Sequence, residues 1–359
     1  MNFKKILLIL VILLAILMFM ATSLSFLNQN FTLTSEAKEN ASIAVTGDVM
    51  FARNMAGVLS SGSSPFEGVS NVTSKVDLLI INFENAATDS NNAVKGDVPL
   101  KCDPDFVPLA KANNNTIATL ANNHVCDYGI DGMKDTINAV SANGMTPVGA
   151  GLNESDAHRA VTKNVNGRNI TVLNYMDSNN FKEYSYEVLP YANGSSPGYS
   201  SYDAADAKEQ IASARGNGSD LVIASLHFGN EYSRSPNDDQ IKIAHELIDN
   251  GADIVIGAHP HVTQGIEMYK GKPICYSLGD FIFDLANPDT LTAYMVKIDL
   301  VNNTGKLTVY PVFISGYVPY FMSPDDGTAL LNDLNPQCSQ LNITENGTGE
   351  LTFNLTETE

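Results

Sequence analysis

The chain has 359 residues, of which 44% are hydrophobic and 17% charged, with 40 acidic residues against 21 basic ones. This apolar fraction can fill the core of one large domain or two small ones, so a mainly disordered chain is excluded. The formal net charge of −19 excludes non-specific binding to nucleic acid, because phosphate backbones are held by basic surface that this chain lacks.

The N-terminus carries an uninterrupted apolar stretch over residues 6–27, directly after Lys4 and Lys5. At about 1.5 Å per residue this stretch extends roughly 33 Å, the thickness of a bilayer core. We expect a single-pass membrane anchor here, with residues 1–5 in the cytoplasm and the bulk of the chain outside it. A cleaved signal peptide is the alternative, although its apolar region is usually shorter. Both interpretations place the following domain outside the cytoplasm, on or beyond the cell membrane.

Two further features agree with an extracytoplasmic location. Asn-x-Ser/Thr sequons are dense, which predicts a glycoprotein if the chain meets a glycosylation system, although an Asn-rich composition explains them equally. They begin at Asn30, Asn40, Asn71, Asn114, Asn153, Asn169, Asn193, Asn217, Asn302, Asn342, Asn346 and Asn354. Four cysteines permit disulfides: Cys102 and Cys126 can pair, Cys275 is expected to be a buried thiol, and Cys338 lies near the C-terminus. All three pairings stay open.

Strand-like and helix-like segments alternate after a polar linker at residues 28–41, which predicts an α/β domain over residues 42–323. The expected strands are Ser42–Gly47, Val76–Asn82, Thr116–Ala121, Ile170–Tyr175, Asp220–Leu226 and Asp253–Gly257. The expected helices are Ile130–Ala142, Ala204–Ala214 and Asp238–Asn250. Further strands are expected at Ile274–Leu278, Ala293–Leu300 and Lys306–Ser315, the last two joined by a hairpin turn at Asn302–Gly305. Residues 324–359 form a polar C-terminal tail that we expect to be loosely ordered.

Polar side chains follow five separate predicted strands, at the point where each strand ends. They are Asp48, Glu84, Asn122-Asn123-His124, His227 and His259-Pro260-His261. Because open α/β sheets bind ligands beyond the carboxyl ends of their strands, we expect these groups to share one rim. A set of oxygen and imidazole ligands without thiolates suits Mn²⁺, Fe²⁺ or Zn²⁺, and we expect the site to hold one or two such ions. His158 and His245 lie in helical patterns, and we expect the first at the surface and the second in packing.

Each of these signals has a plainer explanation when taken alone. A Gly-Asp after a strand is a common turn or helix cap, which would account for Asp48. The Asn122-Asn123-His124 segment can be a polar turn, and His259 and His261 can be a hydrogen-bonded structural pair. The five together favour a metal site, because each falls where sheet topology demands a ligand.

At this point the motifs are recognisable as a set: the chain resembles the CapA family of poly-γ-glutamate (capsule) biosynthesis proteins, within the calcineurin-like metallophosphoesterase superfamily. The matching segments are TGDVMFAR (46–53), NFEN (82–85), LANNHVCDYG (120–129), PVGAG (147–151), HFGNEY (227–232), GADIVIGAHPHV (251–262) and YSLGDFIFD (276–284). The resemblance implies a four-layer α/β/β/α sandwich that carries a site for one or two divalent metal ions.

The resemblance also implies a role for each site residue. Asp48 matches a ligand of the first metal, Glu84 the bridging carboxylate and Asn123 the amide ligand. The remaining ligands match His227, His259 and His261. His124 matches the catalytic histidine beside the leaving group, and Arg53 is a candidate phosphate contact because of its fork geometry.

The sequence departs from the superfamily pattern at four positions. Met50 stands where an imidazole ligand is usual, so one metal position loses a ligand. Glu84 replaces the more frequent Asp, and Asn85 replaces a frequent Gly. Asp280 replaces the usual Asn of YSLGNF and adds a carboxylate that would alter the charge balance if it faces the site.

These observations lead to an expected function with two competitors. The expectation is a membrane-anchored, extracytoplasmic CapA-like protein of capsule-type polymer biosynthesis, which hydrolyses a phosphoester or a γ-glutamyl amide with metal-activated water and His124 as acid. The first competitor is a non-catalytic, metal-containing accessory protein that binds or anchors an anionic cell-surface polymer. Other membrane proteins of polymer synthesis are expected partners in either case. The second is a secreted phosphoesterase without a capsule role.

Overall fold

The computed structural model describes residues 39–185, 187–334 and 340–355, together with residues 2, 3, 5, 18 and 20. The chain divides into two units, Met1–Lys38 and Glu39–Glu359, and the fold below is that of the second. The expected cytoplasmic stub, the membrane anchor at residues 6–27 and the linker lie outside the described residues, apart from isolated positions and residues 39–41. Among the residues that are described, no helix has both the length and the apolar character needed to cross a bilayer.

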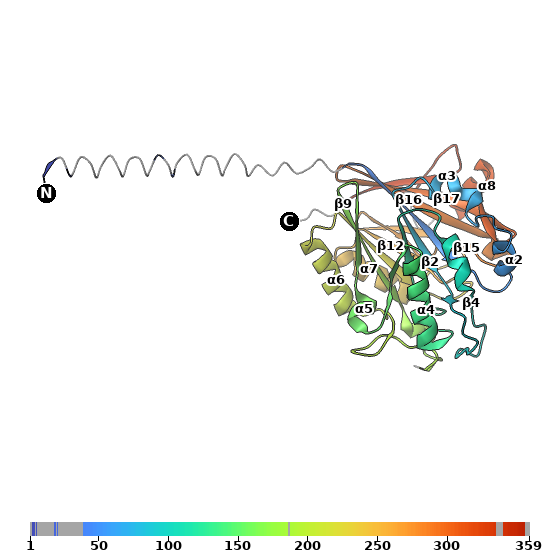
Figure 1. Ribbon diagram of the computed structural model, residues 1–359. Helices are drawn as coiled ribbons and strands as arrows, with labels where there is room; N and C mark the ends of the chain where they lie inside the picture. The colour runs from blue at the N-terminus through green and yellow to red at the C-terminus, as the bar shows by residue number, and fades with distance from the viewer. Residues whose placement is uncertain are drawn as a thin grey trace. The chain divides into compact units, whose positions relative to one another are not determined.

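The larger sheet has ten strands and is built around β1, which runs parallel to β2 and antiparallel to β16 (Figure 1). Its strands follow in the order β19 (Asn342–Ile343), β20 (Gly349–Asn354), β17 (Thr304–Ser315), β16 (Thr292–Val301), β1 (Ala41–Val49), β2 (Leu78–Phe83), β5 (Thr116–Thr119) and β6 (Thr146–Val148). Two short strands add to it: β15 (Asp280–Ile282) pairs with β1, and β18 (Val318–Phe321) pairs with β17.

The second sheet has six strands with a parallel centre, where β9, β11, β12 and β14 run in the same direction. Their order is β13 (Ile266–Tyr269), β14 (Lys272–Cys275), β12 (Ile254–Ala258), β11 (Leu221–His227), β9 (Arg168–Met176) and β8 (Val161–Val165). Two small ladders complete the strands: β3 (Ala86–Ala87) with β4 (Lys101–Cys102), and β7 (Ala150–Gly151) with β10 (Gly198–Tyr199).

Two of the longer helices begin with side-chain caps that satisfy their first amides. The Asp203 carboxylate caps α6, and Asn237 with Gln240 forms a capping box on α7. The described α-helices are α2 (Met55–Leu59), α3 (Ser70–Thr73), α4 (Gly129–Ala142), α5 (Glu154–His158), α6 (Ala204–Gly216), α7 (Asp238–Asp249) and α8 (Pro324–Leu334). Four 3₁₀ turns accompany them: η1 (Glu67–Val69), η2 (Pro104–Ala110), η3 (Ser178–Phe181) and η4 (Pro288–Leu291).

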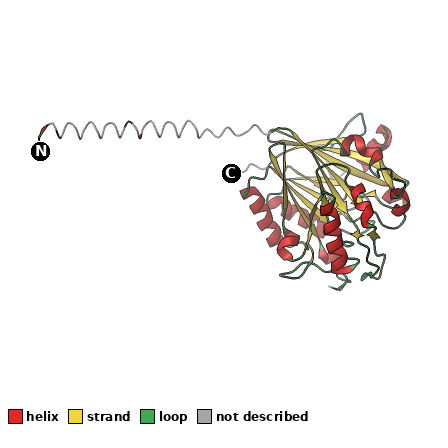
Figure 2. Ribbon diagram, viewed as in Figure 1, coloured by secondary structure: helices red, strands yellow, loops and turns green. Residues whose placement is uncertain are grey.

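The two sheets pack face to face through alternate apolar side chains of their strands. Ile43 and Val45 of β1 belong to one buried cluster with Ile223 of β11 and Ile256 of β12. The other faces of the sheets carry the helices: α4 packs on the first sheet, and α6 and α7 pack on the second. Figure 2 shows the strands lying between two groups of helices. The expected mixed α/β class is confirmed, and its layers follow the order that the resemblance implied.

The central elements lie where the sequence predicts them, and their ends differ by at most a few residues. The hairpin between β16 and β17 turns at Asn302, as expected. The prediction of a loosely ordered tail is wrong for its described part. Leu330, Leu331 and Leu334 of α8 are buried in the core between the sheets, and β20 pairs with β17. Apolar residues spaced for one helix face and one strand face explain this order despite the polar composition.

Candidate metal centre

The first sheet delivers two carboxylates to one edge. Asp48 lies at the end of β1 and Glu84 directly follows β2, and both are fully buried. Asp280 of β15 is paired beside Asp48 in the ladder and is also buried. Asn82 of β2 donates its amide to Asp48 Oδ1 at 2.7 Å, which fixes the orientation of that carboxylate. Parallel pairing of β1 with β2 and β15 therefore concentrates acidic side chains at this edge.

The second sheet delivers the histidines. His227 ends β11 and is in register with Ala258, the last residue of β12, so His259 and His261 follow immediately beside it. Both histidines of this His-Pro-His turn have positive φ, 98° at His259 and 60° at His261. Such backbone is costly for residues with a Cβ and is concentrated at functional sites. The strained turn directs two imidazoles toward the carboxylates of the first sheet.

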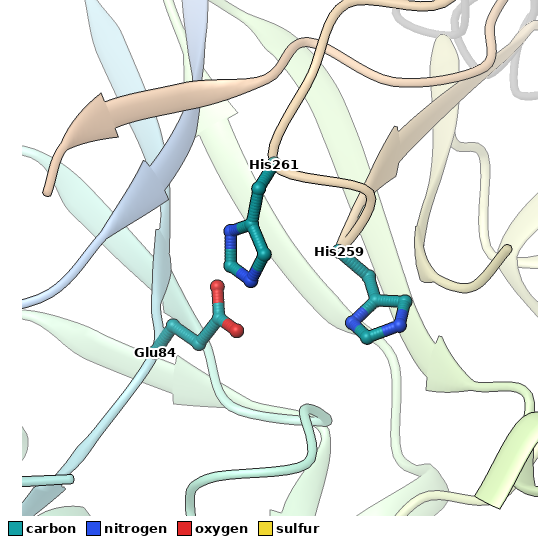
Figure 3. Close-up of side chains that lie close together, drawn as sticks. All are labelled: Glu84, His259 and His261. Carbon is teal, nitrogen blue, oxygen red and sulfur yellow. The ribbon is translucent and has the colours of Figure 1, made fainter. Parts of the chain in front are cut away.

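The two edges meet in a buried cluster that contains three overlapping groups with metal-binding geometry. In each group, one ligand atom from every residue lies within 4.8 Å of the others: Glu84 with His259 and His261, Asp48 with Glu84 and His227, and Asp48 with His261 and Asp280. Figure 3 shows the Glu84 carboxylate pointing toward the His261 ring, with the His259 ring alongside. Asp48, Glu84, His227, His259 and His261, which the sequence predicted as ligands, are thus brought together.

The polar atoms of this cluster fit a cation. Both carboxylate oxygens of Glu84, Nδ1 of His259 and Oδ2 of Asp280 are buried and have no hydrogen-bond partner among the residues that the structure describes. Burial, and then the nearby Asp48 carboxylate, raises the pKa of Glu84 well above its ordinary value. Burial likewise raises the pKa of Asp280, to about 7. Buried polar groups normally have partners, so orphaned oxygens and nitrogens that face one another indicate that an ion belongs between them.

The pKa values of the clustered histidines are shifted in opposite directions. Burial, followed by the other histidines, lowers the pKa of His227 and of His259 well below the ordinary value. Both are therefore neutral near pH 7, which is the form that binds metals. The pKa of His261 is raised despite its burial, because Asp280 accepts from its Nδ1 at 2.8 Å and Asp48 lies 3.4 Å away. A carboxylate on one ring nitrogen is the usual way to orient a metal-binding histidine.

Asn123 and His124 lie beside this cluster, after β5. Asn123 Oδ1 is 2.9 Å from His227 Nε2, so the predicted amide ligand faces a predicted imidazole ligand. His124 Nδ1 donates to Asp127 Oδ2 at 2.6 Å, because a carboxylate can only accept. This leaves Nε2 of His124 for another group. Burial lowers the pKa of His124, and Asp127 opposes the shift.

A cavity of about 260 Å³ opens over these residues and is lined by His124, Asn123 and His261. Arg53, the predicted phosphate contact, also lines it, with its guanidinium paired to Asp284 and 5.6 Å from the Phe283 ring centre. The structure therefore places Arg53 in the cavity wall, where its guanidinium can meet a phosphate.

Sequence reasoning missed several residues of this site. Lys95 is buried in the cavity wall, 3.3 Å from the Asn123 carbonyl oxygen and 3.8 Å from Asp127 Oδ1, and no motif marks it. Asp127 has a signal, since His-x-x-Asp within one turn lets the two side chains meet. The sequence marks Asp280 only as a departure from the family pattern, and this residue does face the site. Met50 is buried in the hydrophobic core beside the first sheet.

Three residues outside the site bear on the other predictions. His158, expected at the surface, is only 7% exposed, and its Nδ1 lies 2.9 Å from Asp206, so that expectation is wrong. His245 packs as expected, stacked on Tyr269 with ring centres 3.7 Å apart. Cys102 and Cys126 are buried thiols that do not pair with each other. Cys338 lies outside the described residues.

Comparisons with known proteins agree with the motifs. The chain is 34% identical over 284 residues to the PGA biosynthesis protein CapA of Bacillus subtilis, covering 77% of this chain and 73% of that protein. It is 34% identical to the capsule biosynthesis protein CapA of Bacillus anthracis, covering 77% and 69%.

Among solved structures, the calcineurin-like phosphoesterase YfkN of Bacillus subtilis aligns with a TM-score of 0.42 and 13% identity over 90% of this chain and 94% of that one. A hypothetical protein of Thermus thermophilus aligns with a TM-score of 0.42 and 15% identity, covering 78% and 98%. The sequence family described as bacterial capsule synthesis protein PGA_cap matches residues 42–285. With this match and the two CapA relatives, the chain belongs to the PGA_cap family of bacterial capsule synthesis proteins.

Proposed function

We propose that this chain is a CapA-type protein of poly-γ-glutamate or capsule-type polymer biosynthesis, and that its cluster of carboxylates and histidines is a hydrolytic metal centre. One observation carries the proposal. Glu84 and His259 have unpartnered atoms and belong to one metal-binding cluster with His261. His261 in turn lines the same cavity as His124, so the cluster adjoins the proposed proton donor. A divalent cation held there would act as a Lewis acid on a phosphoryl or carbonyl oxygen and would activate water.

The residues around the ion have separable tasks in this proposal. Asp48, Glu84, His227, His259 and His261 hold the cation, with Asn123 as a further ligand. His124 in its imidazolium form would donate a proton from Nε2 to the leaving oxygen or nitrogen. Asp127 at Nδ1 stabilises that form and opposes the effect of burial, which lowers the pKa of the ring. Lys95 and Arg53 face the same cavity and would stabilise negative charge on the group that is attacked.

The alternative function is a metal-containing accessory protein that binds or anchors an anionic polymer without turnover. Its specific support is Met50, which is buried where the superfamily has a histidine, so one metal position lacks a ligand. The His124–Asp127 pair argues against it, since binding alone requires no oriented proton donor.

Hydrolysis measured together with metal content distinguishes the two functions. The full-length chain in detergent, loaded with Mn²⁺, Fe²⁺ or Zn²⁺, is assayed on bis(p-nitrophenyl) phosphate and on a γ-glutamyl anilide. We expect turnover by the wild type, loss of about 10²-fold or more in His124→Ala with metal retained, and full activity in the control His245→Ala. Metal bound without turnover on either compound would support the accessory function instead.

The proposal also includes the location. The apolar stretch at residues 6–27 supports a single-pass anchor with the domain outside the cytoplasm, where sequons and a surface polymer would meet it. Carbonate extraction of membranes and protease treatment of intact cells test this directly. Release by carbonate, or protection from external protease, would contradict the anchored extracytoplasmic topology.

A further inference from the structure

The mouth of the active-site cavity is acidic, in contrast to its floor. Asp97, Glu183 and Glu231 line the cavity, come from three different loops and are exposed to solvent. Within the described part of the chain none of the three has a hydrogen bond or an ion pair. Exposed acids elsewhere on the domain are often paired, as Asp249 is with Lys270. Three unpaired carboxylates around one opening form a ready site for positive charge.

Two tyrosines complete this mouth. Burial, followed by Asp97, Glu183 and Glu231, raises the pKa of Tyr184, so the three carboxylates act together at this one hydroxyl. Tyr232 is 48% exposed, and its ring centre lies 6.1 Å from that of His261. Carboxylates combined with exposed aromatic faces are the usual means of binding an ammonium group.

The floor of the cavity carries basic side chains and therefore favours an anionic group. Lys95 is buried there, with its ammonium 5.3 Å from the centre of the Tyr184 ring, and Arg53 lies in the same wall. The adjacent cluster contains the unpartnered oxygens of Glu84 and the unpartnered Nδ1 of His259, which mark the cation site that adjoins this floor, independently of the acidic mouth. A bound cation would add further positive charge to this floor.

We propose that the ligand of this cavity is a small zwitterion or a chain end, with an anionic group on the floor and a primary ammonium group at the mouth. The inference deepens the proposed function and rests on it. Like charges repel across a few ångströms, so the mouth disfavours the interior of a polyanion, in which every unit is negative. The amino end of such a chain, or an aminoalkyl phosphate, carries both charges that the cavity accepts.

Calorimetric binding to the full-length, cation-loaded protein tests the inference with matched probes. One pair is O-phosphoethanolamine and ethyl phosphate; the other is γ-glutamylglutamate and its N-acetyl derivative. Each exposed charge contact contributes up to about 1 kcal/mol to binding. With three carboxylates at the mouth, we expect the ammonium compound of at least one pair to bind about tenfold more tightly than its partner. The pair that shows the preference identifies the source of the ammonium ligand.

The variants decide whether the mouth is responsible. In Asp97→Asn/Glu183→Gln/Glu231→Gln the preference should fall to about twofold or less. A control with the same change of charge away from the cavity, Glu67→Gln/Glu209→Gln/Glu345→Gln, should keep it. Equal wild-type affinities within both pairs, or an undiminished preference in the first variant, overturns the inference while leaving the hydrolytic proposal intact. Failure of all four probes to bind the loaded protein overturns both.

Discussion

Buried carboxylates are the residues that most constrain the account of this site. Asp48, Glu84 and Asp280 are each at most 1% exposed, and they face one another across the edge of one sheet. A protein does not normally bury this much negative charge without compensation, and the histidines that are held neutral supply none. A divalent cation compensates the charge and also gives partners to the orphaned atoms.

Asp280→Asn tests the part of this centre that departs from the superfamily. The variant keeps the shape but replaces the carboxylate that accepts from His261 Nδ1 with a neutral amide, so the ring has a weaker acceptor and the centre loses a negative charge. We expect cation affinity to fall by about 10- to 100-fold, measured by competition with a chelator of known affinity. Asp131→Asn, on the exposed face of α4, is the control, and equal affinities in the two variants would show that Asp280 plays no part.

For single residues, the sequence predicts the metal ligands better than the residues that contact those ligands. Asp48, Glu84, His227, His259 and His261 all follow strand ends, and strand ends can be read from apolar runs. Lys95 comes from an irregular loop with no periodicity, so nothing in the sequence brings it to His124. The prediction for His158 is wrong because a five-residue helix does not determine which of its faces is covered.

The position of the metal-binding edge depends on how closely β1 approaches its neighbours. A Cβ on Gly47 would lie 1.9 Å from the carbonyl oxygen of Gly279, and that oxygen accepts from the Asp48 amide at 3.1 Å. Only glycine permits this approach, and the approach fixes Asp48 beside Asp280.

Gly47→Ala is expected to disturb both stability and the metal centre. Overpacking at a buried position costs about 1–3 kcal/mol, and displacement of Asp48 should weaken cation binding by about tenfold. Urea denaturation and chelator competition measure the two effects. Gly57→Ala, in α2 with open space at its Cβ, should leave binding unchanged and stabilise the fold slightly. A Gly47→Ala protein that binds the cation normally would refute the positional argument.

The opposite end of the second sheet is tied by Asp253, which precedes β12. Its carboxylate contacts Arg215 of α6 at 2.5 Å and Lys272 of β14 at 2.7 Å, and it accepts from the Val222 amide of β11. Burial opposes ionisation, but Arg215 and Lys272 together hold the pKa of Asp253 below its ordinary value. One buried carboxylate therefore joins the strands that end in His227 and Ala258.

Asp253→Asn should show how much the ion pairs of Asp253 contribute to the free energy of unfolding, and at which pH they do so. Because the folded-state pKa is lowered, the stabilisation is present above the unfolded value of about 3.9 and is lost as pH falls through the folded value. We expect a loss of about 3 kcal/mol in the free energy of unfolding at pH 7, with a smaller difference below about pH 4. Asp249→Asn at the exposed Lys270 pair should change little. A pH-independent difference between wild type and Asp253→Asn would exclude the ionic explanation.

The sequence predicts the helices and strands that are buried and strongly patterned, but it does not predict the strands at the sheet edges. The central strands β1, β2, β11 and β12 read as short apolar runs, and α7 carries a capping signal that fixes its start. The edge strand β8 and the short strand β15 are too brief or too polar to show a period of two. Helix α8 falls in a stretch that composition predicts as a tail, because acidic residues interrupt its apolar face and sequons follow it.

On the scale of the whole domain, the metal centre lies where two independently built sheets meet, so the ion is expected to stabilise the assembly. A cation that binds only the folded state at 100 times its dissociation constant contributes about 2.7 kcal/mol. Removal by EDTA should lower the midpoint of thermal unfolding by roughly 5 °C, and added Mn²⁺ or Zn²⁺ should restore it. A midpoint that does not respond to either treatment would contradict a cation at the junction.

Elemental analysis of the purified full-length protein tests the central claim most directly. After reconstitution and dialysis, we expect one or two equivalents of Mn, Fe or Zn in the wild type and in His245→Ala, and at least one equivalent fewer in His259→Ala. His245 is a fair control because it is a histidine stacked on Tyr269, away from the cluster. No stoichiometric metal in the wild type, or the same metal content in His259→Ala, would contradict the account.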